Sequence, residues 1–508
     1  KNESVNCNRF IFNQDNERWR PVNTFIAIDI GASSGRLMLS RWENEPITLE
    51  EIHRFKNGFR PHEGFDRWAI DYLIQEILVG LQKVKQAGIN NCFVGIDTWA
   101  VDYCLIDQAG ERLGDPVAYR DSRTNDAIAA FGQRYSLQKL YEKTGIQLQP
   151  FNTIFQLAAE EAQLLQKADK LLLIPDYLGY VFTGKMVTEK TNASTMQLLN
   201  ANTQTWDAEL LAEIGVTEGL FPPLVDAGTV LGALQTQKFP AYDLPQATFV
   251  TVASHDTASA IIGTPGEGAD WGYISSGTWS LLGIETKVPN VSLAAFDENY
   301  TNEWGAHNTI RFLKNIMGMW LIQEVARQQD YQYSYAELAE LAQATPAFQQ
   351  FVDVNDPRFL NPENMITELQ AYCRETQQKV PETAGELARC VYDNLALCYA
   401  SELQKLEQLT GTTNKLQKLH IVGGGSNNRF LNQLTADAAQ LTIEAGPSEA
   451  TAIGNLLMQM MSAGIFTSLA EARRAVKHSF PCSVHEPQPF DHKILSNYQR
   501  FIEGVGKK

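Results

Sequence analysis

Residues 24–42 read TFIAIDIGASSGRLMLSRW, and residues 270–285 read DWGYISSGTWSLLGIE. Each stretch joins two apolar runs through a short turn built of Gly, Ser, Ala or Thr. Apolar runs rich in β-branched residues and bounded by such turns are typical of buried strands joined as a hairpin. Because the same pattern restarts near the middle of the chain, the sequence predicts two related domains.

The surrounding sequence favours an α/β fold. A strand-like run at 93–98 and helix-like patterns at 71–86 and 387–409 follow the two hairpins in the mixed order typical of this class. The Gly- and Pro-rich segment GTPGEG at 263–268 has the composition of a domain boundary. We therefore expect an extension at 1–22, a first domain at 23–263, a second domain at 264–490 and a tail at 491–508.

The composition excludes several classes of function. The chain has 508 residues and a formal net charge of −17, so it lacks the basic surface that binding to a nucleic-acid backbone needs. No apolar run is long enough for a membrane span. The seven cysteines are nowhere spaced as C-x-x-C, which predicts reduced thiols in a cytoplasmic protein. Cys373 and Cys390 lie in neighbouring helical patterns and form the one pair that we would test for a bridge.

Two common nucleotide-binding motifs are not supported. GYVFTGKM at 179–186 matches a P-loop through its lysine but has Met186 where a Ser or Thr hydroxyl contacts Mg²⁺. No G-x-G-x-x-G opens a helix after a strand, so a dinucleotide site is not expected.

Three glycine-rich turns, at 31–36, 275–278 and 423–425, are candidate phosphate-binding elements. Backbone N–H groups in such turns converge on one anion. Asp29, at the end of the first strand, can hold Mg²⁺ through water, because Mg²⁺ on phosphates keeps several waters and takes one or two carboxylates. Each turn alone is also consistent with an ordinary Gly/Ser turn. Their recurrence in both halves of the chain favours a phosphate site.

The segment SHDT at 254–257 supplies a candidate general base. Asp256 lies where a strand-like run enters a helical pattern, between His255 and Thr257. A carboxylate in this position can accept a proton from a substrate alcohol and orient the attacking oxygen toward a phosphorus atom. An aspartate that caps a helix beside a buried histidine is the alternative interpretation.

The complete set of motifs resembles the FGGY family of carbohydrate kinases, and within it the branch that phosphorylates L-rhamnulose. The similarity runs from about residue 24 to residue 467 through the segments DIGASSGR, GIDTWAVDY, AYRDSR, IPDYLGYVFTG, ASHDTASA, SSGTWSLLG, LKNIMGMWL and HIVGGGSNN. The resemblance implies an actin-like ATPase fold: two RNase H-like domains with a central cleft, the sugar and first phosphate loop in the N-terminal domain and the nucleotide in the C-terminal one. It also implies transfer of the γ-phosphoryl group of ATP, with Mg²⁺, to the 1-hydroxyl of L-rhamnulose in L-rhamnose breakdown.

The resemblance also implies roles for individual residues, with Asp256 as the general base. The implied sugar contacts are Ala100, His255, Asp256, Thr257 and Asn315. The implied nucleotide contacts are Ala32, Ser33, Ser34, Gly35, Arg36, Thr278, Gln323 and Gly424. The sequence departs from the family pattern TWGVD, because TWAVD has Ala100 in place of a glycine whose backbone contacts the sugar. The added methyl group disfavours a positive φ at that position.

Two other functions stay open. One is a kinase of another ketose, such as L-fuculose or L-xylulose. The other is a non-kinase ATPase switch of the same architecture, whose slow ATP turnover no sugar accelerates. In each case we expect small-molecule ligands, no nucleic acid or membrane, and a monomer or homodimer.

Overall fold

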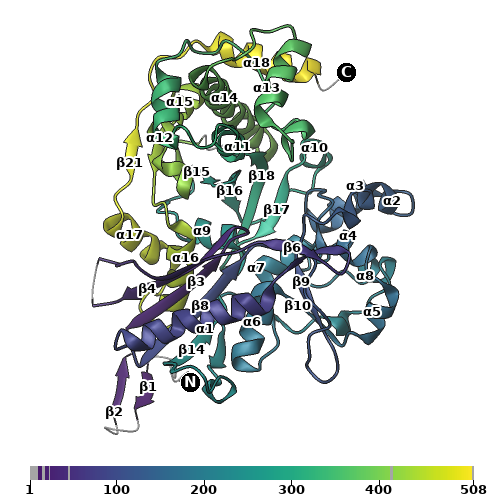
Figure 1. Cartoon of the computed structure of the whole chain (residues 1–508), viewed down its shortest axis with the longest axis vertical. Coiled ribbons are helices and arrows are strands. Elements are labelled where there is room, and N and C mark those ends of the chain that lie inside the picture. The colour runs from purple at the N-terminus through teal and green to yellow at the C-terminus, as the bar shows by residue number, and fades with distance from the viewer. Residues whose placement is uncertain (1–9, 14–17, 22, 44–45, 412–415, 506–508) are drawn as a thin grey trace. The chain divides into compact units, whose positions relative to one another are not determined.

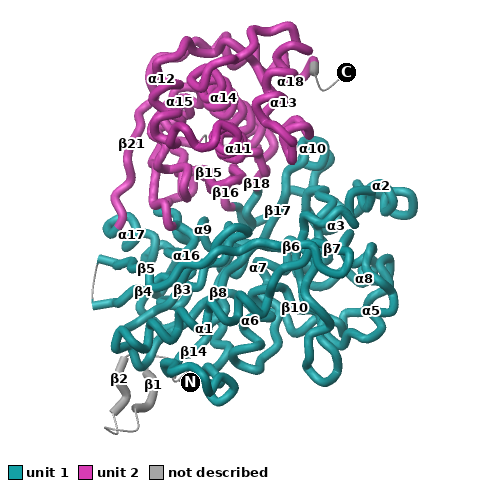
Figure 2. Tube along the Cα trace, viewed as in Figure 1, with its two compact units in different colours: residues 1–265, 286–312, 450–479 teal, residues 266–285, 313–449, 480–508 magenta. Residues whose placement is uncertain are grey.

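The computed structural model describes residues 10–13, 18–21, 23–43, 46–411 and 416–505. The chain divides into two compact units (Figure 2). Unit 1 comprises residues 1–265, 286–312 and 450–479, and unit 2 comprises residues 266–285, 313–449 and 480–508. The first change of unit falls within the GTPGEG segment. Each of the segments 286–312 and 450–479 then returns the chain to unit 1.

Unit 1 is built on a six-stranded sheet of order β13-β14-β8-β3-β4-β5. The predicted hairpin forms, since β3 (Thr24–Ile30) pairs antiparallel with β4 (Ser34–Arg41). Strand β3 also pairs parallel with β8 (Asn91–Thr98), which contains the run predicted at 93–98. The other strands are β5 (Glu50–Lys56), β13 (Val230–Ala233) and β14 (Gln246–Val250).

Helices bury the central strands of this sheet (Figure 1). Ile26, Ile28 and Ile30 of β3 share one hydrophobic core with α1 (Ile70–Gln86), the helix predicted at 71–86, and with α6 (Ile174–Thr183). Helix α16 (Ala450–Ser462) also reaches β3, because Gln459 Nε2 donates to the Ile26 carbonyl at 2.9 Å. Strands covered in this way read as continuous apolar runs, which is why FIAI and FVGI are recognisable in the sequence.

A second hydrophobic core of unit 1 lies under β9 (Tyr103–Ile106) and β10 (Lys170–Leu173), which pair antiparallel. Unit 1 also contains the strands β6 (Phe59–His62), β7 (Phe65–Trp68), β11 (Thr188–Glu189), β12 (Leu224–Val225) and β17 (Thr301–Trp304). Its other helices include α2 (Ala127–Gly132), α3 (Leu137–Thr144), α4 (Thr153–Ala158), α5 (Ala162–Lys167), α7 (Lys190–Ala193), α8 (Ala208–Glu213), α9 (Asp256–Ile262), α10 (Leu293–Asp297) and α17 (Leu469–Ser479).

Unit 2 repeats the pairing pattern of unit 1. Strands β15 (Trp271–Ser276) and β16 (Trp279–Thr286) form the second predicted hairpin, and β15 pairs parallel with β19 (Lys418–Val422). Strand β20 (Thr442–Ala445) pairs parallel with β19, and β21 (Ser483–His485) pairs antiparallel with β20 at the edge of the sheet. The chain enters unit 2 along β18 (Ile310–Met317). The inference of two related halves is thus matched by the strand pairings.

The helices of unit 2 include α14 (Ala384–Thr410), which contains the helix predicted at 387–409. Its start is set by a capping box in which Thr383 and Glu386 satisfy each other's backbone N–H groups. The others are α11 (Trp320–Gln328), α12 (Tyr335–Gln343), α13 (Met365–Glu375), α15 (Arg429–Ala439) and α18 (His492–Val505), which occupies the predicted tail.

Within the predicted extension, β1 (Phe10–Asn13) pairs antiparallel with β2 (Arg18–Pro21), while Cys7 lies outside the described residues. The six described cysteines are free thiols. Cys373 and Cys390 are buried in unit 2, and their thiols are hydrogen-bonded to each other. Among the described helices, none combines the length and apolar character that a membrane crossing requires.

Candidate active site

The first glycine-rich turn of unit 1 brings Asp29 and Arg36 face to face, because they are register partners across the β3–β4 hairpin. Both the Nε and Nη2 atoms of Arg36 donate to Asp29 Oδ2, at 3.1 and 2.8 Å. The guanidinium group that the resemblance places at the nucleotide therefore reaches a carboxylate of its own hairpin. Asp29 Oδ1 meets no hydrogen-bond donor among the described residues, so this oxygen can accept from a ligand or water.

The tip of this hairpin is open. Ala32 and Ser33 are exposed, and the turn is closed by a bond from the Gly31 N–H to the Ser34 carbonyl at 2.9 Å. Packing also requires a glycine at position 35, in addition to its predicted role at the nucleotide, since an added Cβ would lie 2.1 Å from the Phe55 ring. The ring thus covers the hairpin just behind the tip, and only glycine allows that approach.

Asp97 is a buried carboxyl group at this site that sequence reasoning missed. It is the penultimate residue of β8, in register with Asp29 of β3, so the two aspartates are neighbours on parallel strands. Asp97 Oδ2 accepts from Asn455 Nδ2 at 2.6 Å, whereas Oδ1 has no hydrogen-bond partner among the described residues. Burial, together with the negative charge of Asp29, raises the pKa of Asp97 well above its ordinary value. The segments FIAID and FVGID each end an apolar run with an aspartate, and this similarity was the sequence signal that could have identified the pair.

Asp256 is the first residue of α9, immediately after its N-cap residue His255. Thr257 donates to Asp256 Oδ1 from its backbone N–H at 2.6 Å and from its hydroxyl at 3.1 Å. His255 Nε2 lies 3.3 Å from the same oxygen. No donor among the described residues contacts Asp256 Oδ2. The side chain is 33% exposed, so Oδ2 is the oxygen that can accept a substrate proton.

The electrostatic surroundings of Asp256 suit a general base. Burial raises the pKa of its carboxyl group, the charge of His255 counteracts this effect, and the charge of Asp29 adds to it. A base whose pKa lies above that of a free aspartate accepts a proton more readily. The charges of Asp29 and Asp256 also raise the pKa of Asp97, so these three carboxyl groups of unit 1 lie close enough to repel one another.

The loop before Asp256 is held by bonds to two other segments of unit 1. The Thr98 N–H donates to the Ser254 carbonyl at 2.9 Å, which ties this loop to the end of β8. Glu189 Oε2 accepts from both the N–H and the hydroxyl of Ser254, at 3.1 and 2.9 Å. Since each of these bonds lies within two residues of Asp256, they restrict where its side chain can be.

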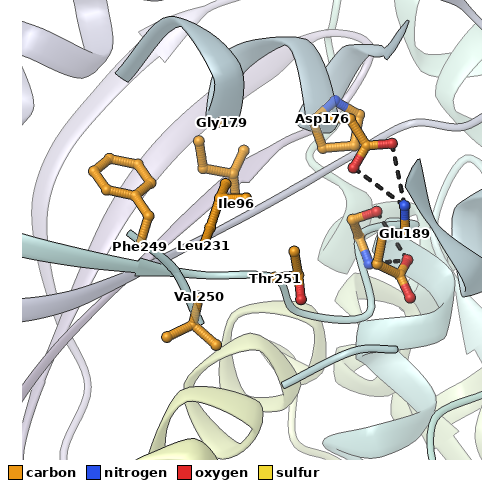
Figure 3. Close-up of a pocket in the computed structure, with 10 residues that line it drawn as sticks. Ile96, Asp176, Gly179, Glu189, Leu231, Phe249, Val250 and Thr251 are labelled. Carbon is orange, nitrogen blue, oxygen red and sulfur yellow. Dashed lines mark hydrogen bonds between the residues drawn. The ribbon is translucent and has the colours of Figure 1, made fainter. Parts of the chain in front are cut away.

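A small pocket lies behind Glu189 (Figure 3). Asp176, from the IPDY segment on α6, faces the Glu189 backbone N–H, which lies 3.3 Å from its Oδ2 atom. Burial and the charge of Glu189 raise the pKa of Asp176 well above its ordinary value. The cavity of about 20 Å³ has room for about one water molecule, so it is too small for a sugar or a nucleotide.

The turn after β8 is consistent with the sequence expectation, which disfavours a positive φ at Ala100. Ala100 does not have a positive φ; the adjacent Val101 does, with φ of 70°. A β-branched residue is unusual in that region. Thr153 Oγ1 donates to the Val101 carbonyl at 2.7 Å. Asp102 anchors the other side of the turn by accepting from the indole N–H groups of Trp68 and Trp99, at 2.6 and 2.9 Å. The methyl group of Ala100 is therefore tolerated because the unusual φ lies one residue later.

In unit 2 the second and third glycine-rich turns come together. An added Cβ at Gly425 would lie 1.9 Å from Ser276 Oγ, and one at Gly423 would lie 2.8 Å from the Ser276 carbonyl oxygen. Gly424 is exposed and an added Cβ there would meet no atom within 4 Å. These two turns thus form one surface in which backbone can approach a flat ligand closely.

The other predicted residues of unit 2 lie on elements next to the second turn. The exposed residue Thr278 accepts, through its carbonyl, from the Trp320 N–H at 3.1 Å at the start of α11. Gln323 lies on that helix and is partly buried, and Asn315 lies on β18 and is also partly buried. The predicted residues are therefore divided: Asn315, Thr278, Gln323 and Gly424 belong to unit 2, and the others belong to unit 1.

Family models match most of the chain. Residues 24–263 match the N-terminal domain of the FGGY family of carbohydrate kinases, and residues 272–463 match its C-terminal domain. The chain belongs to this family. This FGGY kinase is 66% identical over 481 residues to a protein of Enterococcus faecalis named rhamnulokinase, with 94% of this chain and 97% of that protein covered. It is 53% identical over 479 residues to a Bacillus subtilis protein of the same name, with 94% and 98% covered.

Solved structures of other sugar kinases share the fold. The xylulose kinase of Lactobacillus acidophilus matches with a TM-score of 0.76 at 17% identity, with 95% of this chain and 97% of that chain covered. The glycerol kinase of Plasmodium falciparum, solved with ADP, matches with a TM-score of 0.77 at 16% identity, with 96% and 98% covered. The expectations of an FGGY kinase and of a two-domain α/β, actin-like ATPase fold are confirmed.

The predicted magnesium site fits the residues of the hairpin. Among the described residues, no three His, Cys, Asp or Glu side chains lie close enough together to hold a metal ion. A phosphate-bound Mg²⁺ that keeps its waters needs only one or two carboxylates. Asp29 would offer one of these through Oδ1, to which no described group donates, since Arg36 donates to Oδ2.

Proposed function

We propose that this FGGY kinase transfers the γ-phosphoryl group of ATP to the 1-hydroxyl of L-rhamnulose, and that the L-rhamnulose 1-phosphate serves L-rhamnose catabolism in the cytoplasm. The observation that carries the proposal is the identity of 66%, 53% and 52% to three proteins named rhamnulokinase. Each match covers at least 94% of this chain. Free thiols at all six described cysteines are consistent with a reducing compartment.

In the proposed reaction Asp256 is the general base. Its Oδ2 accepts the proton of the 1-hydroxyl while that oxygen forms a bond to the γ-phosphorus and the bond from this phosphorus to ADP breaks. Thr257 and His255 hold Oδ1, so the rotation of the carboxylate is restricted before the sugar binds. Orientation of the attacking oxygen is the main contribution of such a residue in phosphoryl transfer.

The remaining predicted residues have binding roles in this proposal. Ala100, His255, Thr257 and Asn315 contact the sugar, and the turns at 31–36, 275–278 and 423–425 receive ATP with Gln323. Backbone N–H groups of such turns stabilise the charge that develops on the transferred group. Asp29 would hold Mg²⁺ through water, and the ion would neutralise charge on the phosphates of ATP.

The test measures ADP release with L-rhamnulose, L-fuculose, L-xylulose or no sugar. We expect turnover to depend strongly on sugar and to be fastest with L-rhamnulose. Faster turnover with another ketose would show that this ketose is the substrate. Turnover that no sugar accelerates would show that the protein is an ATPase switch and not a sugar kinase.

The same assay tests the base. Asp256→Asn should reduce kcat by about 10²-fold or more, since a general base contributes about 10²–10⁴-fold, while the KM for L-rhamnulose changes little. Asp226→Asn is the control, because it removes a carboxylate that is 73% exposed and pairs with Lys190 at 2.7 Å. Near-normal turnover of Asp256→Asn would show that another group takes the proton.

A further inference from the structure

A row of buried charged groups lies behind the proposed base. Arg311, on β18, is fully buried, and its Nη2 atom donates to Glu303 Oε2 at 2.9 Å. The same Glu303 oxygen, on β17, lies 3.3 Å from His255 Nδ1. The opposite ring nitrogen, Nε2, lies 3.3 Å from Asp256 Oδ1. All four residues belong to unit 1, and none of the motifs singled out in the sequence contains Glu303 or Arg311.

Arg311 keeps Glu303 ionised. Burial by itself would raise the pKa of Glu303, but the charges and hydrogen bonds of Arg311 and His255 lower it to about 2. Glu303 therefore presents a carboxylate to His255 at neutral pH. A buried charge of this kind is stable only when it is paired, and Arg311 is the partner within the described residues, with Nη2 also 3.4 Å from His255 Nδ1.

The imidazole of His255 is bracketed by two carboxylates, one at each ring nitrogen. Carboxylate oxygens only accept, so an N–H on either ring nitrogen is directed at the carboxylate beside it, which restricts the rotation of the ring about the side-chain bonds. In that orientation His255 Nε2 lies beside Asp256 Oδ1, the oxygen that also accepts from the Thr257 N–H. The oxygen left without a protein donor is Oδ2, the atom proposed to receive the sugar proton.

We propose that Glu303 is a positioning residue: held by Arg311, it orients His255 so that the imidazole holds Asp256 Oδ1 and leaves Oδ2 for the substrate. The inference rests on the proposed function of Asp256. It predicts that Glu303 acts on the reaction only through His255, because no other described group links Glu303 to the base.

A double-mutant cycle on kcat tests this inference. Glu303→Gln keeps the shape of the side chain and removes its charge, and His255→Asn removes the ring. We expect each single substitution to lower kcat by about tenfold or more, since a misplacement of about 1 Å in a reacting group costs about 10²-fold. We expect the KM for ATP to change by less than about twofold. The double variant should be no slower than the slower single variant.

The control breaks another buried ion pair far from these residues in the sequence. Arg389 Nε donates to Asp393 Oδ1 at 2.8 Å within α14 of unit 2, and Asp393 is buried. Asp393→Asn should lower Tm and leave kcat close to that of the wild type. Glu303→Asp is the gentler variant, because it keeps a charge for Arg311 and withdraws the carboxylate from His255 by one methylene. It should fold, as judged by circular dichroism, and still lose kcat.

Two results would overturn the inference: a wild-type kcat for folded Glu303→Asp, or a double variant whose loss equals the product of the single losses. A wrong assignment of the base would give a different result, because Asp256→Asn would then retain turnover independently of any effect of the Glu303 variants. If Asp256→Asn is inactive and the Glu303 and His255 losses multiply, the base stands and only the positioning role of Glu303 is wrong.

Discussion

Substitution of Gly454, on α16, should impair catalysis although it lies far from Asp256 in the sequence. Helices α9 and α16 of unit 1 pack against each other at two glycines, one on each side of the contact. A Cβ added at Gly454 would lie 1.8 Å from the Ser259 carbonyl oxygen, and one added at Gly263 would lie 2.1 Å from the Ala450 carbonyl oxygen. Both obstacles are backbone atoms, which cannot turn away as a flexible side chain can.

The magnitude follows from these distances. For Gly454→Ala, ordinary van der Waals contact begins at 3.4 Å, so the helices must separate by about 1.6 Å at Ser259. Overpacking of this kind costs about 1–3 kcal/mol, which corresponds to a Tm lower by roughly 1 °C for each kcal/mol in a chain of 508 residues. Ser259 is one turn after Asp256 on α9. Because displacement of a reacting group by about 1 Å costs about 10²-fold, kcat should fall by that factor.

The assay compares kcat for ADP release and Tm with those of Gly80→Ala. Gly80 is also a helical glycine of unit 1, on α1, but its added Cβ would meet Leu37 Cδ2, at 2.4 Å, at the end of a flexible side chain. We expect Gly80→Ala to keep most of its kcat. A Gly454→Ala enzyme with lowered Tm but a kcat within about twofold of the wild type would show that α9 adapts without moving Asp256. Unchanged Tm and kcat would refute the close packing itself.

Two further predictions concern the base and the nucleotide turns. Burial outweighs the attraction of His255 and raises the pKa of Asp256 above its ordinary value of 3.8. Because the proposed base must be unprotonated to accept a proton, kcat/KM should rise with pH through that raised pKa. An acid limb centred at 3.8 or lower would contradict this. Gly425→Ala should raise the KM for ATP several-fold more than the KM for the sugar, since its Cβ would lie 1.9 Å from Ser276 Oγ; equal effects on both constants would count against a nucleotide role for these turns.

The sequence by itself determined the two hairpins, the α/β class and the family. These features are local: an apolar run, a turn of small residues and a helical period can each be recognised within about twenty residues. The DIGASSGR, SHDT and SSGT segments were found for the same reason. The family match then assigned a reaction class that the local pattern left open.

Tertiary structure alone decided which side chains meet. Asp97 became a neighbour of Asp29 through the parallel register of β3 and β8, and Glu303 reached His255 across 48 residues of chain. Arg36 turned out to pair with Asp29. The positive φ predicted to be disfavoured at Ala100 was found at Val101. The contact of Glu303 with His255 depends on the pairing and burial of segments far apart in the sequence, so no local pattern contains it. Burial and the neighbouring charges then shift the pKa of each carboxyl group.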